Sequence, residues 1–162
     1  MSETRVVWCV ELIRIFGTRQ SGRTTKAVLE SRGATVFLAT DMQRARVAHD
    51  VAKRLFSCLR VARPERAFGM ENMTFAGFES FRPFGVPCVT LVLELSWQQQ
   101  YMLMEGGRGL HLVSYLRPQR LIVVGSDVRP FQSLRAWLFF RRELTAGGYV
   151  NSERIVWCQR RR

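Results

Sequence analysis

Three short apolar runs constrain the fold of this chain more than any other feature of its sequence. Each run is preceded by a glycine, a proline or a polar residue, and the runs cover residues 34–40, 88–94 and 120–126. Most side chains within them are apolar, without alternation, which is typical of a strand buried on both faces of a parallel sheet. Segments with helical periodicity separate them. We therefore expect an α/β domain, a three-layer sandwich around a mostly parallel central sheet.

The other elements follow from local signals of the same kind. Residues 6–16 are rich in β-branched and aromatic side chains and predict the first strand, mainly in their second half, and two further strands are expected at 73–78 and 154–159. Asp41 has the position of an N-cap for a helix to residue 58, whose apolar positions recur every three or four residues. Further helices are predicted at 24–32, 98–104, 110–116 and 131–145, with a basic loop at 59–70 and a turn at 82–87.

Length and composition indicate one globular domain. The chain has 162 residues, 47% hydrophobic and 23% charged, and we expect a single domain over 1–162 with a short basic tail at 159–162. No apolar run reaches the length of a membrane span, and the first residues do not resemble a signal peptide. The four cysteines are scattered without metal-ligand spacing, so we expect reduced thiols in a cytoplasmic protein, inside the host cell if the protein is viral.

The net charge of +12 bears on the partners of the protein. So basic a surface attracts polyanions, of which nucleic acid is the commonest, and DNA or RNA is the expected partner. A generic basic surface, or contact with acidic proteins, is the alternative. No membrane contact is expected.

Polar residues follow four of the predicted strands. They lie in residues 17–24, at Thr40 and Asp41, in residues 94–96, and at Ser126 and Asp127. Because the carboxyl ends of parallel strands meet at one edge of a sheet, and ligands of such sheets bind there, these segments are expected to gather at a single site.

Residues 17–24 read G-T-R-Q-S-G-R-T, which matches the phosphate-binding template G-x-x-x-x-G-K-[ST] except that arginine replaces lysine at position 23. A strand is predicted before this segment and a helix after it, which is the context that the template requires. Its glycines let the backbone wrap a phosphate chain, and the helix N-terminus presents free N–H groups to the anion. The alternative interpretation is an ordinary turn rich in glycine and serine.

The order of these segments resembles the first RecA-like domain of P-loop NTPases, in the style of helicases and phage terminase-type ATPases. The phosphate loop of that group is similar to residues 19–25, R-Q-S-G-R-T-T, and its Walker B segment is similar to residues 93–96, L-E-L-S. The segment that precedes a nucleic-acid-contacting helix in that group is similar to residues 35–40, T-V-F-L-A-T. The strand that senses the γ-phosphate is similar to residues 121–127, L-I-V-V-G-S-D. The resemblance implies ATP or GTP with Mg²⁺. It further implies a nucleotide site formed by Gly17, Gln20, Ser21, Gly22, Arg23, Thr24, Thr25 and Asp127, with Thr24 as the Mg²⁺ ligand and Glu94 and Arg23 as the catalytic residues.

The chain departs from this family at two positions that matter for catalysis. Arg23 replaces a compact lysine with a larger planar group. In addition, one Walker B carboxylate is missing. Either Glu94 aligns with the catalytic glutamate and Leu93 replaces the metal-side aspartate, or Glu94 is the metal-side acid and Leu95 replaces the base. Both alignments argue against fast phosphoryl transfer.

The sequence therefore predicts a nucleotide-binding P-loop protein that acts in nucleic-acid transactions with weak or no hydrolysis, possibly encoded by a phage or virus. The alternative is a non-enzymatic nucleic-acid-binding or assembly protein on a degenerate P-loop scaffold. Activity as an NTPase is left open. The helix at 131–145 is apolar around more than one face, which favours burial against the sheet or against another chain, including a second copy. His49 is expected at the surface of its helix.

Overall fold

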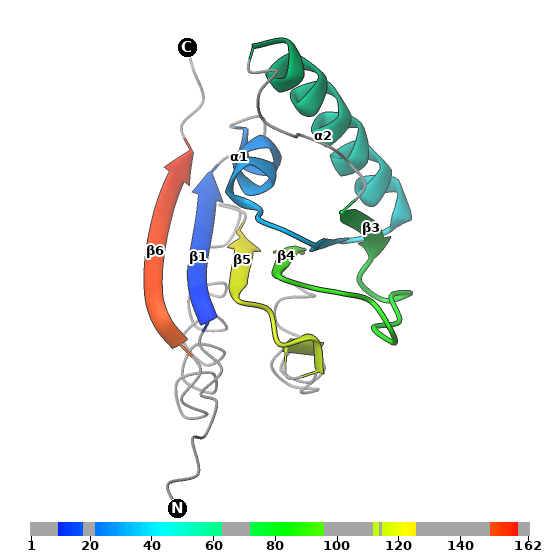
Figure 1. Ribbon diagram of the computed structural model, residues 1–162, viewed down its shortest axis with the longest axis vertical. Coiled ribbons are helices and arrows are strands. Elements are labelled where there is room, and N and C mark those ends of the chain that lie inside the picture. The colour runs from blue at the N-terminus through cyan, green and yellow to red at the C-terminus, as the bar shows by residue number, and fades with distance from the viewer. Residues whose placement is uncertain are drawn as a thin grey trace, which may run out of the picture.

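A six-stranded, all-parallel sheet forms the centre of the computed structural model, as Figure 1 shows. The structure describes residues 10–17, 22–62, 72–95, 112–113, 115–125 and 150–158. The strands lie in the order β3-β2-β4-β5-β1-β6. They are β1 (Val10–Gly17), β2 (Thr35–Ala39), β3 (Met73–Gly77), β4 (Thr90–Glu94), β5 (Arg120–Val124) and β6 (Val150–Cys158). The expected α/β fold with a parallel sheet is confirmed.

Both faces of the sheet are buried, as the continuous apolar runs predict. All five side chains of β2 and all five of β5 are buried, and their alternation divides the core into two clusters. One cluster joins Ile13, Phe37 and Ile122 to the helices. The other, which includes Leu12, Leu38 and Leu121, is covered by residues 78–89 and by the short helical residues 112–113 and 115–116.

The two long helices, α1 (Arg23–Glu30) and α2 (Met42–Ala62), lie on the same face of the sheet. Alanine side chains at the helix–sheet contact are fully buried and let the helix backbones approach the strands closely; they are Ala27, Ala45, Ala48 and Ala52. The second helical layer of the expected sandwich would need residues 98–104 and 131–145, which lie outside the described residues.

Helix α2 begins where the sequence predicts but ends four residues later. The carboxylate of Asp41 accepts a hydrogen bond of 2.8 Å from the backbone N–H of Arg44, so Asp41 is the N-cap, as predicted. The prediction that residues 59–62 belong to a loop is wrong, because the helix continues to Ala62. Leucine, arginine and alanine are good helix formers, and Pro64 disfavours helical geometry only for the residue before it.

Three other boundaries differ slightly from expectation. Helix α1 ends at Glu30 rather than at 32, since the chain turns at Ser31, whose N–H bonds to the carbonyl of Val28. Strand β4 begins at Thr90, two residues after the apolar run starts, and β6 begins at Val150, four residues before its prediction. Among the described residues, no helix is both long and apolar enough to cross a membrane.

Candidate phosphate-binding site at the carboxyl edge of the sheet

The register of the strands places the polar segments predicted to form a site at one edge of the sheet. Ile15 pairs with Val124, Val124 with Glu94, and Glu94 with Ala39, so the carboxyl ends of β1, β5, β4 and β2 lie side by side. Gly17 is the buried last residue of β1. The expectation that these strand ends gather is confirmed for the described residues, whereas Ser96, Ser126 and Asp127 lie outside them.

Helix α1 starts at this edge with a glycine in the left-handed region. Gly22 has a φ of 82°, which residues with a Cβ rarely adopt, and its carbonyl accepts the first helical hydrogen bond, from the N–H of Lys26 at 2.9 Å. Within the described part of the chain, no side chain caps the N-terminus of α1, and its first turn contains no acidic residue. The N–H groups of this turn are therefore available to an anion from outside the helix.

The side chain of Thr24, in the first turn of α1, contacts Glu94 at the end of β4. The hydroxyl lies 3.0 Å from each carboxylate oxygen, and it donates its hydrogen bond across a separation of 70 residues in sequence. Strand β4 directs Leu93 and Glu94 to opposite faces. Leu93 is therefore buried in the cluster away from the helices, while Glu94 faces α1.

The charge of Glu94 is held in a partly desolvated position. Burial raises the pKa of Glu94 above its ordinary value, and the hydrogen bond from Thr24 together with the charges of Arg23 and Arg44 offsets part of that rise. A carboxylate in this state gains from any additional positive charge at the edge of the sheet. A divalent cation would supply such a charge.

Arg23 extends along the same edge to the end of β5. Its guanidinium donates a hydrogen bond to the backbone carbonyl of Gly125, and the N–H of Gly125 in turn bonds to the carbonyl of Ile15 at 2.7 Å. Arg23 therefore connects the start of α1 with the strand between β1 and β4. The sequence places Arg23 at the lysine position of the phosphate loop, and the structure brings its positive charge close enough to Glu94 to lower the pKa of that carboxyl.

The remaining predicted residues divide into two groups. Thr25 follows Thr24 in the first turn of α1 and is half-buried, while Gln20, Ser21 and Asp127 lie outside the described residues. Lys26 lies one turn further along the helix, where its ammonium is 3.5 Å from the carboxylate of Glu30. Its ammonium therefore points along α1 toward the C-terminal end of the helix.

The oxygens of Thr24 and Glu94 fit the chemistry of Mg²⁺. Magnesium prefers hard oxygen ligands, and at its usual bond length of about 2.05 Å neighbouring octahedral positions lie about 2.9 Å apart. The observed separation of 3.0 Å is close to that value. No cluster of three or more histidine, cysteine or acidic side chains occurs among the described residues. An ion bound here would therefore keep water or phosphate oxygens in most of its coordination positions.

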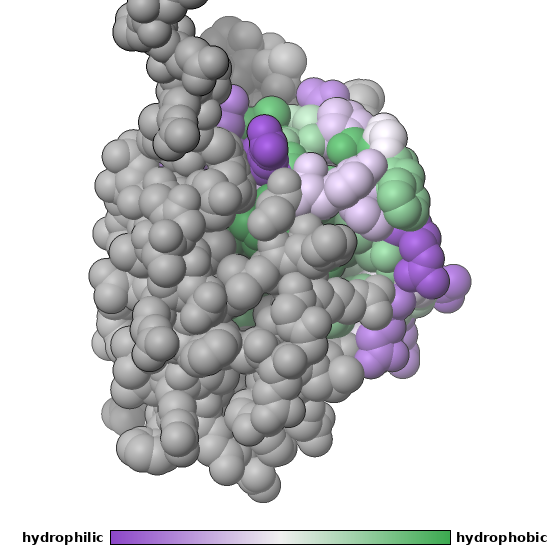
Figure 2. Space-filling model, turned by 90° about the horizontal axis from the view of Figure 1, so that it is seen from below, coloured by the Kyte–Doolittle hydropathy of each residue, from purple (hydrophilic) through white to green (hydrophobic). Residues whose placement is uncertain are grey.

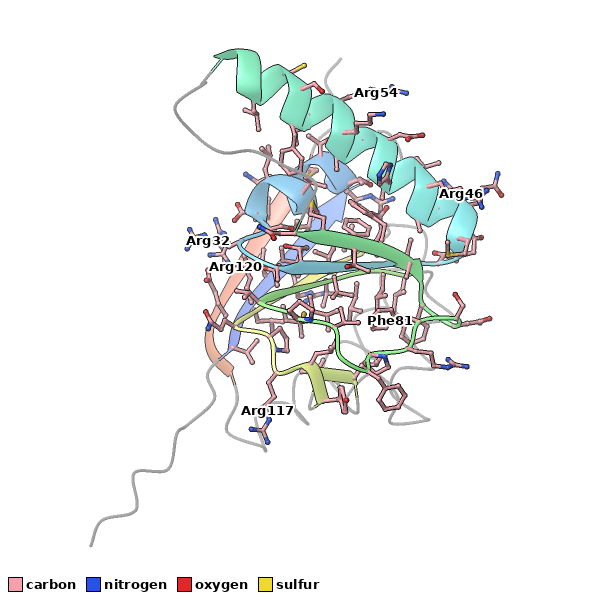
Figure 3. All side chains as sticks on the ribbon, turned by 45° about the vertical axis from the view of Figure 1, so that its right-hand side comes forward. Arg32, Arg46, Arg54, Phe81, Arg117 and Arg120 are labelled. Atoms are coloured by element: carbon pink, nitrogen blue, oxygen red, sulfur yellow. The ribbon has the colours of Figure 1, made fainter. Side chains whose placement is uncertain are left out.

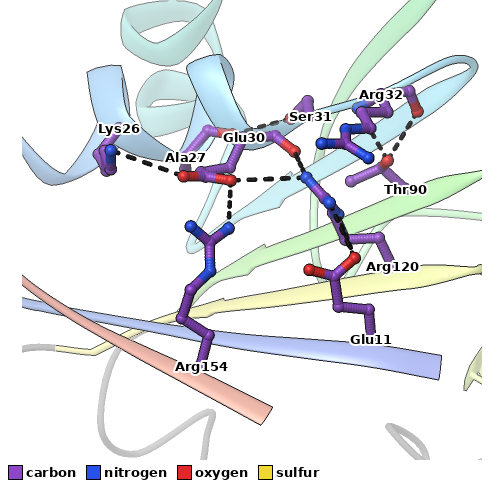
Figure 4. Close-up of polar contacts among 9 residues, drawn as sticks. All are labelled: Glu11, Lys26, Ala27, Glu30, Ser31, Arg32, Thr90, Arg120 and Arg154. Carbon is purple, nitrogen blue, oxygen red and sulfur yellow. Dashed lines mark hydrogen bonds and ion pairs between the residues drawn. The ribbon is translucent and has the colours of Figure 1, made fainter. Parts of the chain in front are cut away.

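A buried ionic network, which sequence analysis missed, lies at the opposite edge of the sheet (Figure 4). Arg120, 5% exposed, donates to the carboxylate of Glu11 at 2.8 Å and to the backbone carbonyl of Glu30 at 2.6 Å. The carboxylate of Glu30 also contacts Arg154 at 2.5 Å. Thr90 adds two hydrogen bonds, to the N–H and the carbonyl of Arg32. These contacts bind the C-terminal end of α1 and so fix the helix that carries Thr24.

The outer surface of α2 is basic. Its exposed side chains include Arg44, Arg46, Lys53 and Arg54, and Figure 3 shows Arg46 and Arg54 pointing away from the sheet. His49 is also exposed, as predicted, and its ring packs edge-on against Phe75 at 5.4 Å.

Comparisons of this chain with protein-family models, curated proteins and solved structures found no match. The interpretation of the site therefore rests on its own geometry and chemistry.

Proposed function

We propose that this protein binds the phosphates of ATP or GTP together with Mg²⁺ at the carboxyl edge of its sheet, as a P-loop NTPase-like protein of the RecA-like class. The observation that carries the proposal is the contact between Thr24 and Glu94. It joins the hydroxyl at the end of the phosphate-loop sequence to the carboxylate at the end of β4, two strands away from β1 in the sheet. An ordinary turn rich in glycine and serine does not require that pairing.

Each residue of the site has a distinct part in this proposal. The N–H groups of the loop from Gly17 to Thr24 hold the phosphate oxygens, and Arg23 adds a positive charge beside them. The oxygens of Thr24 and Glu94 hold the magnesium ion, which when bound would neutralise phosphate charge. Asp127, which lies outside the described residues, is proposed to contact the γ-phosphate, because it follows the last residue of β5 by three positions in the sequence.

Hydrolysis is proposed to be weak or absent. The direct contact of Glu94 with Thr24 favours the alignment in which Glu94 is the metal-side acid. Leu95 then occupies the position of the catalytic base, and this side chain is 4% exposed and packs into the core. A buried leucine cannot orient an attacking water molecule. The site therefore supports binding better than turnover.

The basic face of α2 supports a role in nucleic-acid transactions. Four exposed cationic side chains on one helix, in a protein with a net charge of +12, provide the electrostatic attraction that binds a phosphate backbone. Nucleic acid bound at Arg46 and Arg54, which point away from the sheet in Figure 3, would then occupy a surface separate from the nucleotide site, whereas Arg44 lies close enough to Glu94 to lower the pKa of that carboxyl.

A thermal-shift experiment with nucleotides tests the phosphate site. ATP or GTP with Mg²⁺, at about 100 times its Kd, should stabilise the protein by about 2.7 kcal/mol and raise its melting temperature by roughly 5–10 °C. Thr24→Ala and Gly22→Val should abolish this increment, and EDTA should reduce it. Thr74→Ala, which changes an exposed threonine of β3, is the matched control and should keep the full increment.

The alternative function is a non-enzymatic nucleic-acid-binding or assembly protein on a degenerate P-loop scaffold. The missing carboxylate and the high positive charge favour it. Under this alternative, no nucleotide changes the melting temperature, while binding of DNA or RNA weakens steeply with salt. An assembly role would add self-association through residues 131–145, which size-exclusion chromatography with light scattering would measure.

A further inference from the structure

An exposed pair of aromatic rings lies on the face of the sheet opposite the two helices. Phe84 is 73% exposed and Tyr115 is 51% exposed, and their ring centroids are 5.7 Å apart in an edge-to-face arrangement. Residues next to each ring, Val86 and Leu116, pack against the core cluster on that face. The backbone on either side of the pair is therefore anchored while the rings themselves remain open to solvent.

The backbone on which each ring is mounted has a defined conformation. Phe84 is the second residue of a turn in which the N–H of Val86 bonds to the carbonyl of Pro83 at 3.3 Å. Gly85 supplies the positive φ, 71°, that a type II turn requires at its third position. The second residue of such a turn projects outward, so the turn presents the phenyl ring at its tip.

Tyr115 lies in the short helical stretch that precedes β5, and Arg117 terminates this stretch in an unfavourable conformation. Arg117 has a φ of 47°, and it is the one residue other than glycine with a positive φ among the described residues. Its N–H bonds to the carbonyl of Val113 at 2.9 Å, and the buried Pro118 follows. Residues held in sparsely populated conformations are enriched at binding sites.

Arginines flank both rings. Arg82 is exposed two residues before Phe84, and Arg117 is exposed two residues after Tyr115. In Figure 3, Arg117 points away from the sheet on the side opposite α2. Figure 2, which shows the molecule from below, displays hydrophobic and strongly hydrophilic side chains interspersed over the described surface. Each ring therefore has an exposed, positively charged residue two positions away along the chain.

We propose that Phe84 and Tyr115, with Arg82 and Arg117, form a stacking platform for single-stranded nucleic acid. Unpaired bases stack on exposed aromatic rings whatever their sequence, and exposed arginines close to the rings along the chain can bind the phosphates that connect the bases. A duplex hides the faces of its bases, so it would gain nothing from the rings. This inference rests on the nucleic-acid part of the proposed function and is independent of nucleotide binding.

Fluorescence anisotropy with labelled oligonucleotides tests the platform. The probes are 12-nucleotide oligo-dT and oligo-U and a 12-base-pair duplex, measured with the full chain. Phe84→Leu and Tyr115→Leu keep the apolar character and remove the aromatic ring, and each should weaken single-strand binding about five-fold or more. Duplex binding should not change. Tyr115→Phe keeps the ring and should bind the single strand as the wild type does.

The arginines are tested by salt dependence. Arg82→Gln and Arg117→Gln should each reduce the slope of log Kd against log salt for the single strand by about 0.7. Wild-type affinity in the Phe84→Leu/Tyr115→Leu double variant would overturn the proposal, as would equal losses for single strand and duplex. A change of oligomeric state in that variant, without loss of single-strand binding, would assign the rings to a contact between protein copies instead.

The same variants separate this inference from the proposed nucleotide site. The double leucine variant should keep the melting-temperature increment caused by ATP or GTP, because the rings lie on the face away from α1. If no nucleotide stabilises the wild type but the leucine variants still lose single-strand binding, the nucleotide proposal fails and the platform stands. If nucleotide binding persists while no single strand binds, the platform fails alone.

Discussion

Replacing Arg120 with methionine should destabilise the protein far more than replacing the neighbouring Arg154 in the same way. Arg120 is buried and donates to the side chain of Glu11 and to the backbone carbonyl of Glu30. Arg154 is half-exposed, with 48% of its side chain accessible. Among the described residues, its ionic contact is with the carboxylate of Glu30. The two substitutions remove the same charge from the same network, so they form a matched pair.

The expected magnitude follows from the contacts that each substitution breaks. A charge-assisted hydrogen bond contributes about 1.5–3 kcal/mol, and Arg120 makes one to a carbonyl at the end of α1 that would otherwise be unsatisfied. The bonds to Glu11, whose side chain is 37% exposed, add up to about 1 kcal/mol. Methionine retains most of the packing of the arginine stem. Arg120→Met should therefore cost about 3 kcal/mol, and Arg154→Met less than about 1 kcal/mol.

Thermal unfolding followed by circular dichroism measures this difference. For a chain of this length, about 3 kcal/mol corresponds to a melting temperature lower by roughly 6–12 °C, against at most about 4 °C for Arg154→Met. Urea unfolding at 25 °C should give the same ranking. Equal and small losses of stability in both variants would refute the argument that Arg120 anchors α1. They would mean that water replaces Arg120 as the partner of Glu11 and of the Glu30 carbonyl at little cost in free energy.

Four further predictions follow from other contacts. Glu94→Gln should stabilise the ligand-free protein at pH 7 by roughly 0.5–2 kcal/mol, which raises its melting temperature, because burial raises the pKa of Glu94 and disfavours its charged form. The same substitution should remove the Mg²⁺-dependent part of the stabilisation by nucleotide. Burial alone would raise the pKa of Glu30, but the hydrogen bond from Arg154 and the charges of Arg154 and Lys26 together outweigh it and lower that pKa, so ionised Glu30 stabilises the fold at pH values above its ordinary pKa of 4.5. This stability should be lost as the pH falls through the lowered pKa, and Glu30→Gln should flatten the acid limb of a plot of stability against pH. Gly77→Ala should cost about 1–3 kcal/mol in urea unfolding, because the new Cβ would lie 3.1 Å from backbone atoms at the start of α2; no measurable loss would show that the helix shifts freely. Arg117→Gly should stabilise the protein by about 1 kcal/mol, since glycine adopts the positive φ without strain, and a lower melting temperature would contradict this.

Much of the fold could be predicted because its signals are local. The runs at 34–40, 88–94 and 120–126 contain the strands Thr35–Ala39, Thr90–Glu94 and Arg120–Val124, which are buried on both faces of the sheet. Asp41 caps α2 through a contact only three residues along the chain. The edge that gathers the strand ends could also be predicted, because it follows from parallel pairing alone. Given that edge, predicting the contact between Thr24 and Glu94 requires only the correct order of the strands in the sheet.

The contacts that fix α1 could not be predicted from the sequence. Arg120 stands at the start of an apolar run, where a charged residue ordinarily faces solvent, and its partners are 109 and 90 residues away in the sequence. Neither hydrophobic periodicity nor a sequence motif predicts a contact between residues so far apart in the sequence. The aromatic pair was missed for a similar reason: Phe84 lies in a turn and Tyr115 in a short helical stretch, and only the folded chain brings their rings together.

The anchoring of α1 separates stability from ligand chemistry along a single eight-residue helix. Arg120 binds the carbonyl of Glu30, the last residue of the helix, and Thr90 binds Arg32 just beyond it, whereas the first turn meets Glu94 at the other edge of the sheet. Substitutions in the first turn of α1 would therefore leave the contact of Arg120 at the other end of the helix in place. If the proposed function holds, residues of the ligand site can change while the helix stays attached to the sheet.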